Sequence, residues 1–198
     1  MKKWLIPLII IVALILYGVS VYNSMVPKRN ATEKQWANVE SAYQRRADLI
    51  PNLVKTVQGA ADFEKSTLTD VIEARAKATQ TTIDPSNITP EKLAEFQQAQ
   101  QGLSGALSRL LVAVERYPEL KANENFKELQ SQLEGTENRI NVERNRFNEV
   151  ATEYKNLIQK FPNNMFASVF GFNPMPLFKA DEGSDKAPDV NFDFNKKE

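Results

Sequence analysis

The chain begins with a long uncharged apolar run and continues as a polar chain of 198 residues in all. Residues 4–22 contain no Asp, Glu, Lys or Arg. As a helix rising about 1.5 Å per residue, this run spans roughly 28 Å, close to the hydrocarbon thickness of a bilayer. Trp4 at one end and Tyr17 and Tyr22 at the other are typical of side chains that anchor a helix at membrane interfaces. The pattern predicts a membrane anchor over residues 1–22, with the lipid bilayer as partner of residues 4–22.

A cleaved signal peptide is the alternative interpretation of this segment. Lys2 and Lys3 precede the apolar run, and residues 18–20 (Gly-Val-Ser) supply small residues at a spacing suited to cleavage. The run is longer than the apolar region of a typical signal peptide, and it continues through Val21 and Tyr22. We therefore favour a retained anchor, while the question of cleavage stays open.

The charges that flank the run leave the orientation open. Lys2 and Lys3 lie before it, and Lys28, Arg29 and Lys34 follow soon after it. Positive charge on both sides gives the positive-inside rule no clear direction. By analogy with signal sequences, a short basic head before an anchor favours an external C-terminal domain.

Beyond Pro27 the apolar residues recur three and four positions apart, which is helical spacing. The spacing runs through residues 36–78, 93–117 and 126–161. We expect Pro51 to kink or break the first stretch, with Asp48 as a cap for a restarted helix.

Turn signals separate these stretches. Residues 81–89 are expected to form a loop, and Thr89 followed by Pro90 predicts the start of the next helix. A short apolar stretch at residues 165–172 is expected to add a final helical turn. Gly102 and Gly105 lie inside a helical stretch, and we expect close helix–helix approach there.

Long amphipathic helices joined by short loops must bury their apolar stripes against each other. The predicted fold is therefore all-α: an N-terminal transmembrane helix, then an antiparallel four-helix, up-and-down bundle over residues 23–172. Residues 173–198 are expected to form a disordered, flexible tail, because the residues after Phe178 include six acids and four lysines and few apolar side chains.

Several positions on the stripes carry polar or charged side chains instead of apolar ones. Because a buried charge without a partner costs several kcal/mol, we expect at least one buried or half-buried pair among Arg46, Glu64, Arg75 and Glu143. Such a structural polar cluster would fix the register of the helices. A binding or catalytic cluster, or charges that simply face water, are the alternatives. The polar stripe positions are Arg46, Glu64, Arg75, Gln100, Thr136 and Glu143.

Composition excludes several classes of function. The chain has no His and no Cys, so it cannot build a Ser-His-Asp or Cys-His nucleophile or a zinc site of the usual ligands. None of its seven glycines forms a phosphate-binding loop motif. The net charge of zero argues against binding of nucleic acid by phosphate neutralisation. We expect no catalytic residues, no cofactor and no metal.

The run Arg-Arg-Ala-Asp-Leu-Ile-Pro-Asn-Leu-Val-Lys-Thr-Val at residues 45–57 is the most specific motif in the chain. Together with Trp-Ala-Asn-Val at residues 36–39 and Arg-Phe-Asn at residues 146–148, it resembles the signature of the bacterial LemA family. Glu64 and Arg75 also lie in matching stretches. The resemblance covers residues 3 to about 172 and the Val-Asn-Phe at 190–192. Phe147 is a departure, since the family usually has Tyr there.

The resemblance implies a single-pass protein of the bacterial cell (inner) membrane with a long-helix bundle and no established catalytic activity. Some accounts of relatives place the helical domain in the cytoplasm. The expected function is a membrane-anchored scaffold or adaptor with protein partners of unknown identity. A small-ligand sensor or enzyme using the Arg/Glu cluster, and a structural component of envelope stress, are the alternatives.

Overall fold

The computed structural model describes residues 4–59 and 63–179. Within these ranges the chain forms helices and no strands. The helices are α1 (Leu5–Gln58), α2 (Lys65–Gln80), α3 (Pro90–Val114), α4 (Pro118–Ala122), α5 (Glu124–Gln159) and α6 (Asn163–Phe170).

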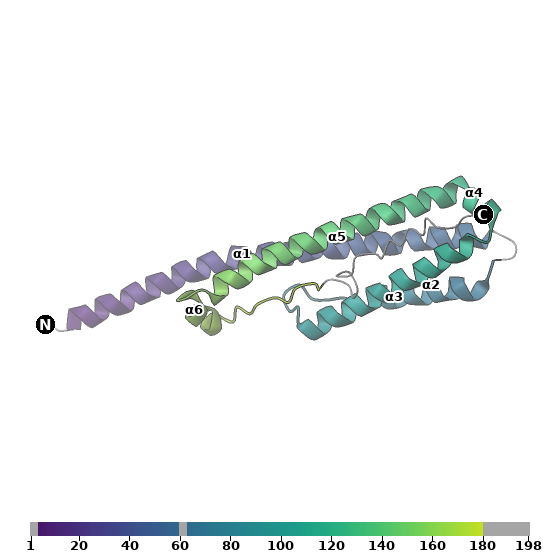
Figure 1. The fold of residues 1–198 in the computed structure, drawn as a ribbon. Coiled ribbons are helices and arrows are strands. Elements are labelled where there is room, and N and C mark those ends of the chain that lie inside the picture. The colour runs from purple at the N-terminus through teal and green to yellow at the C-terminus, as the bar shows by residue number, and fades with distance from the viewer. Residues whose placement is uncertain (1–3, 60–62, 180–198) are drawn as a thin grey trace, which may run out of the picture.

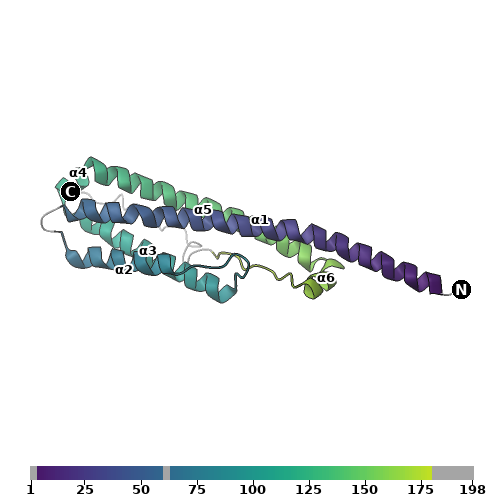
Figure 2. The same cartoon turned by 180° about the vertical axis from the view of Figure 1, so that it is seen from behind.

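The four long helices run alternately up and down, with α1 beside α5 and α2 beside α3 in both views of the ribbon (Figures 1 and 2). The short α4 turns the chain at the far end of the bundle, and α6 follows α5 back beside α1 (Figure 1). The predicted all-α architecture with an antiparallel bundle is confirmed.

Helix α1 extends well beyond the bundle at its N-terminal end (Figure 1). It is 54 residues long, and its first part, residues 5–17, is exposed along its whole length. Gly18 and Val21 are the first buried residues, so the bundle begins there. An 18-residue stretch near the N-terminus of α1, most of it exposed, is long and apolar enough to cross a membrane. The anchor and the bundle therefore share one continuous helix.

The expectation of a break at Pro51 was wrong. Helix α1 passes through both Pro27 and Pro51 and ends at Gln58, and α2 begins at Lys65. Asp48 lies inside α1 and caps no helix. The predicted start at Thr89 is confirmed, because the Thr89 side chain accepts a hydrogen bond from the Lys92 N–H with Pro90 in the first turn.

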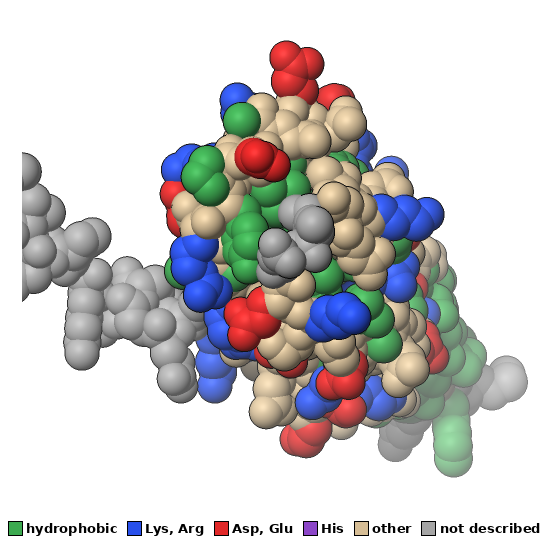
Figure 3. All heavy atoms as spheres, turned by 90° about the vertical axis from the view of Figure 1, so that its right-hand side faces the viewer, with side chains coloured by type: hydrophobic (Ala, Val, Ile, Leu, Met, Phe, Trp, Pro, Cys, Tyr) green, Lys and Arg blue, Asp and Glu red, His purple; other side chains and the backbone are tan. Residues whose placement is uncertain are grey.

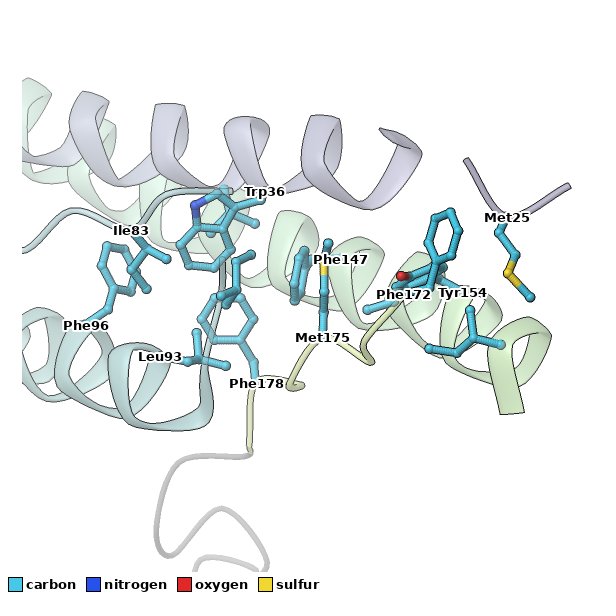
Figure 4. Close-up of a cluster of buried hydrophobic side chains, with 14 of the residues drawn as sticks. Met25, Trp36, Ile83, Leu93, Phe96, Phe147, Tyr154, Phe172, Met175 and Phe178 are labelled. Atoms are coloured by element: carbon cyan, nitrogen blue, oxygen red, sulfur yellow. The ribbon is translucent and has the colours of Figure 1, made fainter. Parts of the chain in front are cut away.

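The segment after α6 is packed into the bundle. Phe172, Met175 and Phe178 are buried, and their side chains point toward α1 and α5 in the close-up (Figure 4). The ring of Phe178 stacks on Trp36 at 5.7 Å between centroids. Residues 173–179 thus differ from the flexible tail expected for 173–198, because these apolar side chains fill the space between α1, α3 and α5. Residues 180–198 lie outside the described residues.

The expectation of close helix approach at the mid-helix glycines was wrong. A Cβ built at Gly102 meets nothing within 4 Å, and one at Gly105 meets only the side chain of Arg109 at 3.8 Å. Close approach occurs instead at Gly18, where an added Cβ would lie 3.0 Å from the Phe166 ring. Glycine at position 102 therefore lowers helix stability without a packing role.

We expect Gly102→Ala to raise the free energy of unfolding by about 1 kcal/mol, because alanine has the better helix propensity and the position is open. Gly18→Ala is the matched comparison and should give no gain, since its new methyl group presses on Phe166. Urea denaturation followed by circular dichroism measures both changes. A loss of stability in Gly102→Ala would contradict this interpretation.

Candidate functional site

The interior of the bundle is divided into two apolar clusters. One lies toward the membrane anchor and includes Trp36, Phe96 and Phe147, and the other lies toward α4 and includes Leu53 and Leu110. Between them, at the level of Arg46, the facing positions are polar. We call this level the polar layer, which consists of Arg46, Arg75, Gln100, Ser104 and Glu137.

Arg46 is the centre of the polar layer. Its side chain comes from α1 and is buried. One terminal nitrogen, Nη1, donates to Ser104 Oγ on α3 and to Glu137 Oε2 on α5, each at 2.8 Å. The other, Nη2, donates to Gln100 Oε1 at 2.7 Å and to the Gln100 carbonyl at 3.3 Å. A rigid, planar guanidinium suits this task because it presents donors to several acceptors at once.

The layer extends to α2 through two further hydrogen bonds. Gln100 Nε2 donates to the carbonyl of Ala78 at 3.1 Å. Arg75 Nε donates to the carbonyl of Ala47 at 2.7 Å. All four long helices are therefore joined at one level by directional bonds, which fixes their register more sharply than apolar contacts can.

The bond from Arg75 also explains why α1 continues through Pro51. Proline has no N–H, so the carbonyl four residues earlier loses its helical donor. That carbonyl belongs to Ala47, and Arg75 on α2 supplies the missing donor. A neighbouring helix thus satisfies the group that Pro51 leaves unpaired inside its own helix.

This pairing predicts coupled effects of two substitutions. Arg75→Met should lower the free energy of unfolding by about 2 kcal/mol, because the buried carbonyl of Ala47 loses its donor. In a Pro51→Ala background, the N–H restored at position 51 donates to the Ala47 carbonyl. Arg75→Met should then lower the free energy of unfolding by less than about 1 kcal/mol. Lys77→Met, at an exposed position of α2, is the control. Equal losses in both backgrounds, measured by urea denaturation, would refute the coupling.

The structure does not bring the four charged stripe residues into one cluster. Arg46 and Arg75 both belong to the polar layer, where their partners are Glu137 and a backbone carbonyl. Glu64 is exposed and forms an ion pair with Arg116 at 3.3 Å.

The fourth of these residues, Glu143, lies one level closer to the membrane. It is buried, and it accepts a hydrogen bond from Gln35 Nε2 at 2.7 Å. It also forms an ion pair with Arg146 at 3.4 Å. The ionic partner of Arg46 is therefore Glu137 and not Glu64 or Glu143.

The sequence pattern did not reveal three of the polar partners, which are Gln35, Ser104 and Glu137. Glu137 stands at the start of a run rich in Glu, Asn and Arg that reads as a solvated helix face. Its position beside Thr136, which is on the stripe and buried, is the one signal in the sequence that it borders the core. Gln35 precedes the buried Trp36 in the same way.

Two pockets flank the polar layer and share Tyr43 and Gln100 in their walls. The larger, of about 290 Å³, also has Glu40 and Ser41 in its wall. The smaller, of about 170 Å³, is lined by Arg46, Ser104 and Glu137 among others. These cavities have the size for small polar molecules and offer amide, hydroxyl and charged groups. Among the residues that the structure describes, no group of carboxylates is arranged to hold a metal ion.

Glu40 makes the larger pocket sensitive to pH. Burial raises the pKa of the Glu40 carboxyl above its ordinary value of 4.5. The folded chain therefore binds this proton more tightly than the unfolded chain. The resulting stability is fully present below about pH 4.5 and is lost as the pH rises through the folded pKa.

Glu40→Gln is accordingly expected to raise the melting temperature at pH 7 by a few degrees at most, because the neutral amide avoids burial of a charge. The gain should disappear near pH 4, where Glu40 is itself protonated. Thermal unfolding of both proteins at the two pH values checks this, with Glu149→Gln at an exposed position as the control. A gain that does not depend on pH would contradict the assignment.

The expected anchor residues differ in their surroundings. Trp4 is 83% exposed at the start of the apolar part of α1. Tyr17 and Tyr22 contact rings of α6, with Tyr17 lying 5.6 Å from Phe166 and Tyr22 lying 5.3 Å from Phe170 between centroids. The end of the span nearest the bundle is thus covered on one side by α6.

Comparison with known proteins identifies relatives of this bundle. Magnetosome protein MamQ 2 of Paramagnetospirillum magneticum is 27% identical over 181 residues, which cover 83% of this chain and 66% of the relative. Magnetosome protein MamQ of Magnetospirillum gryphiswaldense is 27% identical over 174 residues, covering 79% of this chain and 64% of the relative. The chain thus spans just under two thirds of the length of these magnetosome proteins.

A further relative is Protein LemA of Metamycoplasma hominis, 24% identical over 162 residues that cover 81% of this chain and 69% of that protein. The names of these relatives describe no enzymatic activity. The sequence profile of the LemA family matches residues 35–192, which include most of the bundle and the whole polar layer but not the apolar span. A match over so much of the chain establishes that this chain belongs to the LemA family.

Proposed function

We propose that the protein is a membrane-anchored scaffold that presents the surface of its helical bundle to protein partners at a fixed distance from the membrane. The observation that carries this proposal is the continuity of α1, which is exposed and apolar over residues 5–17 and becomes a buried core helix of the bundle. No loop separates anchor and bundle. A continuous helix holds the bundle at a fixed distance from the membrane, whereas a flexible linker would let that distance vary.

The dimensions of the bundle support such a role. From Tyr22 to the end of α1 at Gln58, the helix rises by roughly 54 Å at about 1.5 Å per residue. The end that carries α4 therefore stands far from the bilayer. Figure 3 looks along the bundle from this end and shows acidic, basic and apolar side chains intermingled on its surface. This end therefore presents charged and apolar groups together to a partner.

Site-specific photocrosslinking in cells tests the scaffold. A photoreactive residue is placed at Val112 or Val142, both of which are exposed on the bundle. The buried Leu110 is the matched negative control on α3. Position 9, in the apolar part of α1, is the positive control, because lipid adducts formed there show that the photoreactive residue works. We expect protein adducts from the exposed positions and none from Leu110. Lipid adducts at Ile9 without protein adducts at the exposed positions would overturn the proposal.

Labelling of a single cysteine determines the side of the membrane on which the scaffold acts. The native chain has no cysteine, so Val112→Cys provides the one reactive thiol. Labelling by an impermeant reagent in intact cells places the bundle outside, where an envelope component would act. Labelling only after permeabilisation places it in the cytoplasm.

The pockets beside the polar layer support a second candidate, a sensor of small polar ligands. Glu40, Ser41 and Gln100 offer hydrogen-bonding groups in the wall of the larger pocket. Ligand-observed NMR with a set of small carboxylic acids and amides should find a saturable binder. Binding should be lost in Ser41→Phe, which fills the pocket from an exposed position. An unchanged signal in Ser41→Phe, or no binder, would exclude this candidate.

A further inference from the structure

Helix α6 exposes an apolar face that the bundle does not cover. Phe161 just before it, and Met165 and Val169 within it, are 78%, 62% and 80% exposed. Met165 and Val169 are four residues apart and therefore lie on one side of α6, and Phe161 is exposed just before the helix begins. The opposite side packs on the bundle through Phe166, which is partly buried, and Ala167, which is buried. Exposed apolar groups gathered on one face mark a surface that contacts something other than water.

The position of α6 along α1 identifies what covers this face. Phe166 packs so closely on Gly18 that a Cβ there would lie 3.0 Å from its ring, and it also contacts Tyr17. Phe170 contacts Tyr22. These partners form the last part of the apolar span. Helix α6 therefore lies beside α1 where the exposed residues 5–17 end (Figure 1).

Charge around α6 fits the same surroundings. The chain contains no Asp or Glu from residue 154 to residue 179, while Lys155, Lys160 and Lys179 lie in that stretch. Lys160 immediately precedes the exposed Phe161 and is itself exposed. A lysine beside inserted apolar groups can extend its charged end toward lipid headgroups.

We propose that α6 is an interfacial membrane helix, with Phe161, Met165 and Val169 inserted among the lipids beside the end of the span. The bundle is then attached at two points, through α1 and through α6. One helix alone leaves rotation and tilt free, whereas a second contact beside it fixes which face of the bundle turns toward the membrane. The segment that follows α6 buries Phe172, Met175 and Phe178 in the bundle, so this contact is joined directly to the core.

The inference is tested by quenching of a fluorescent label by lipids. Val169→Cys in the naturally cysteine-free full chain receives an environment-sensitive label, and the protein is reconstituted into lipid nanodiscs of phosphatidylcholine and phosphatidylglycerol. Lipids with a nitroxide near the headgroup or near the bilayer centre act as quenchers. Val112→Cys, apolar and 71% exposed on α3, is the matched control outside the membrane, and Ile9→Cys is the control within the span.

We expect the label at position 169 to be quenched by the shallow nitroxide at least about fivefold more strongly than the label at position 112, as an interfacial helix requires. The label at position 9 should respond more to the deep nitroxide. Adding Met165→Glu should reduce quenching at position 169 while circular dichroism stays unchanged, because Met165 is exposed.

Two results would overturn the proposal. One is a label at position 169 that behaves like the label at position 112. The other is a label whose fluorescence emission is blue-shifted but is not quenched by lipid nitroxides, and whose blue shift disappears when each nanodisc holds one chain. That result would show that a second copy of the chain, and not lipid, covers α6. Neither result depends on whether the bundle has protein partners.

Discussion

Trp36→Ala is expected to lower the free energy of unfolding by about 4 kcal/mol, the largest effect of a single substitution in this bundle. The indole is fully buried. It contacts Phe96, Phe147 and Phe178, each with ring centroids within 5.7 Å. Removing it opens a cavity between α1, α3, α5 and the C-terminal segment, and these elements cannot all close over it. Urea denaturation in detergent, followed by circular dichroism, measures the loss.

The second tryptophan of the chain provides the control. Trp4→Ala changes the same side chain at an exposed position outside the bundle and should leave the stability of the bundle unchanged. Trp36→Phe should fall between Trp36→Ala and the native chain, because it restores part of the lost volume. A loss below about 1 kcal/mol for Trp36→Ala would show that the aromatic cluster does not stabilise the bundle as its burial indicates.

Arg46→Met is expected to lower the free energy of unfolding by about 3 kcal/mol. Methionine replaces the buried stem of the side chain but not its donors. Glu137 is half-exposed and can turn to water, whereas the side-chain oxygen of Gln100 is left in the interior without this donor. The cost therefore comes mainly from the buried acceptor and less from the ion pair.

A double substitution separates these contributions. In Arg46→Met with Gln100→Leu, both ends of the central bond are apolar, and the loss should be smaller than the sum of the two single losses by about 1 kcal/mol or more. Arg45→Met is the control, because Arg45 is the exposed neighbour on α1. Additive losses would show that Arg46 and Gln100 do not act as a pair. If Arg46→Met lowers the free energy of unfolding by no more than Arg45→Met does, the polar layer does not stabilise the bundle.

Local signals in the sequence predicted the helices well. The spacing of apolar residues three and four apart lies in the chain itself, and so does the Thr89-Pro90 start signal of α3. The motif at residues 45–57 also predicted membership of the LemA family, and the profile match over residues 35–192 confirms that prediction. These features depend on neighbours within a few turns, so no knowledge of packing is needed to read them.

Pro51 shows where local rules fail. Alone, a proline removes a helical donor and predicts a break. The fold brings Arg75 to the carbonyl of Ala47, and this distant donor allows the helix to continue to Gln58. The partner of Arg46 is a similar case, since Glu137 and Glu143 lie on the same helix and only the packing of α5 on α1 decides that Glu137 is in reach.

The amino-acid pattern alone predicted an apolar segment long enough to cross a membrane, the helical character of the chain and the charged positions on apolar stripes. These follow from composition and periodicity, which act over short stretches of chain. Packing between distant segments determines which charges meet, places residues 172–178 in the core, and sets α6 beside the end of the apolar segment with its apolar face exposed. Those outcomes depend on contacts between residues far apart in sequence, as between Trp36 and Phe178, and a burial pattern along one helix does not specify its partner.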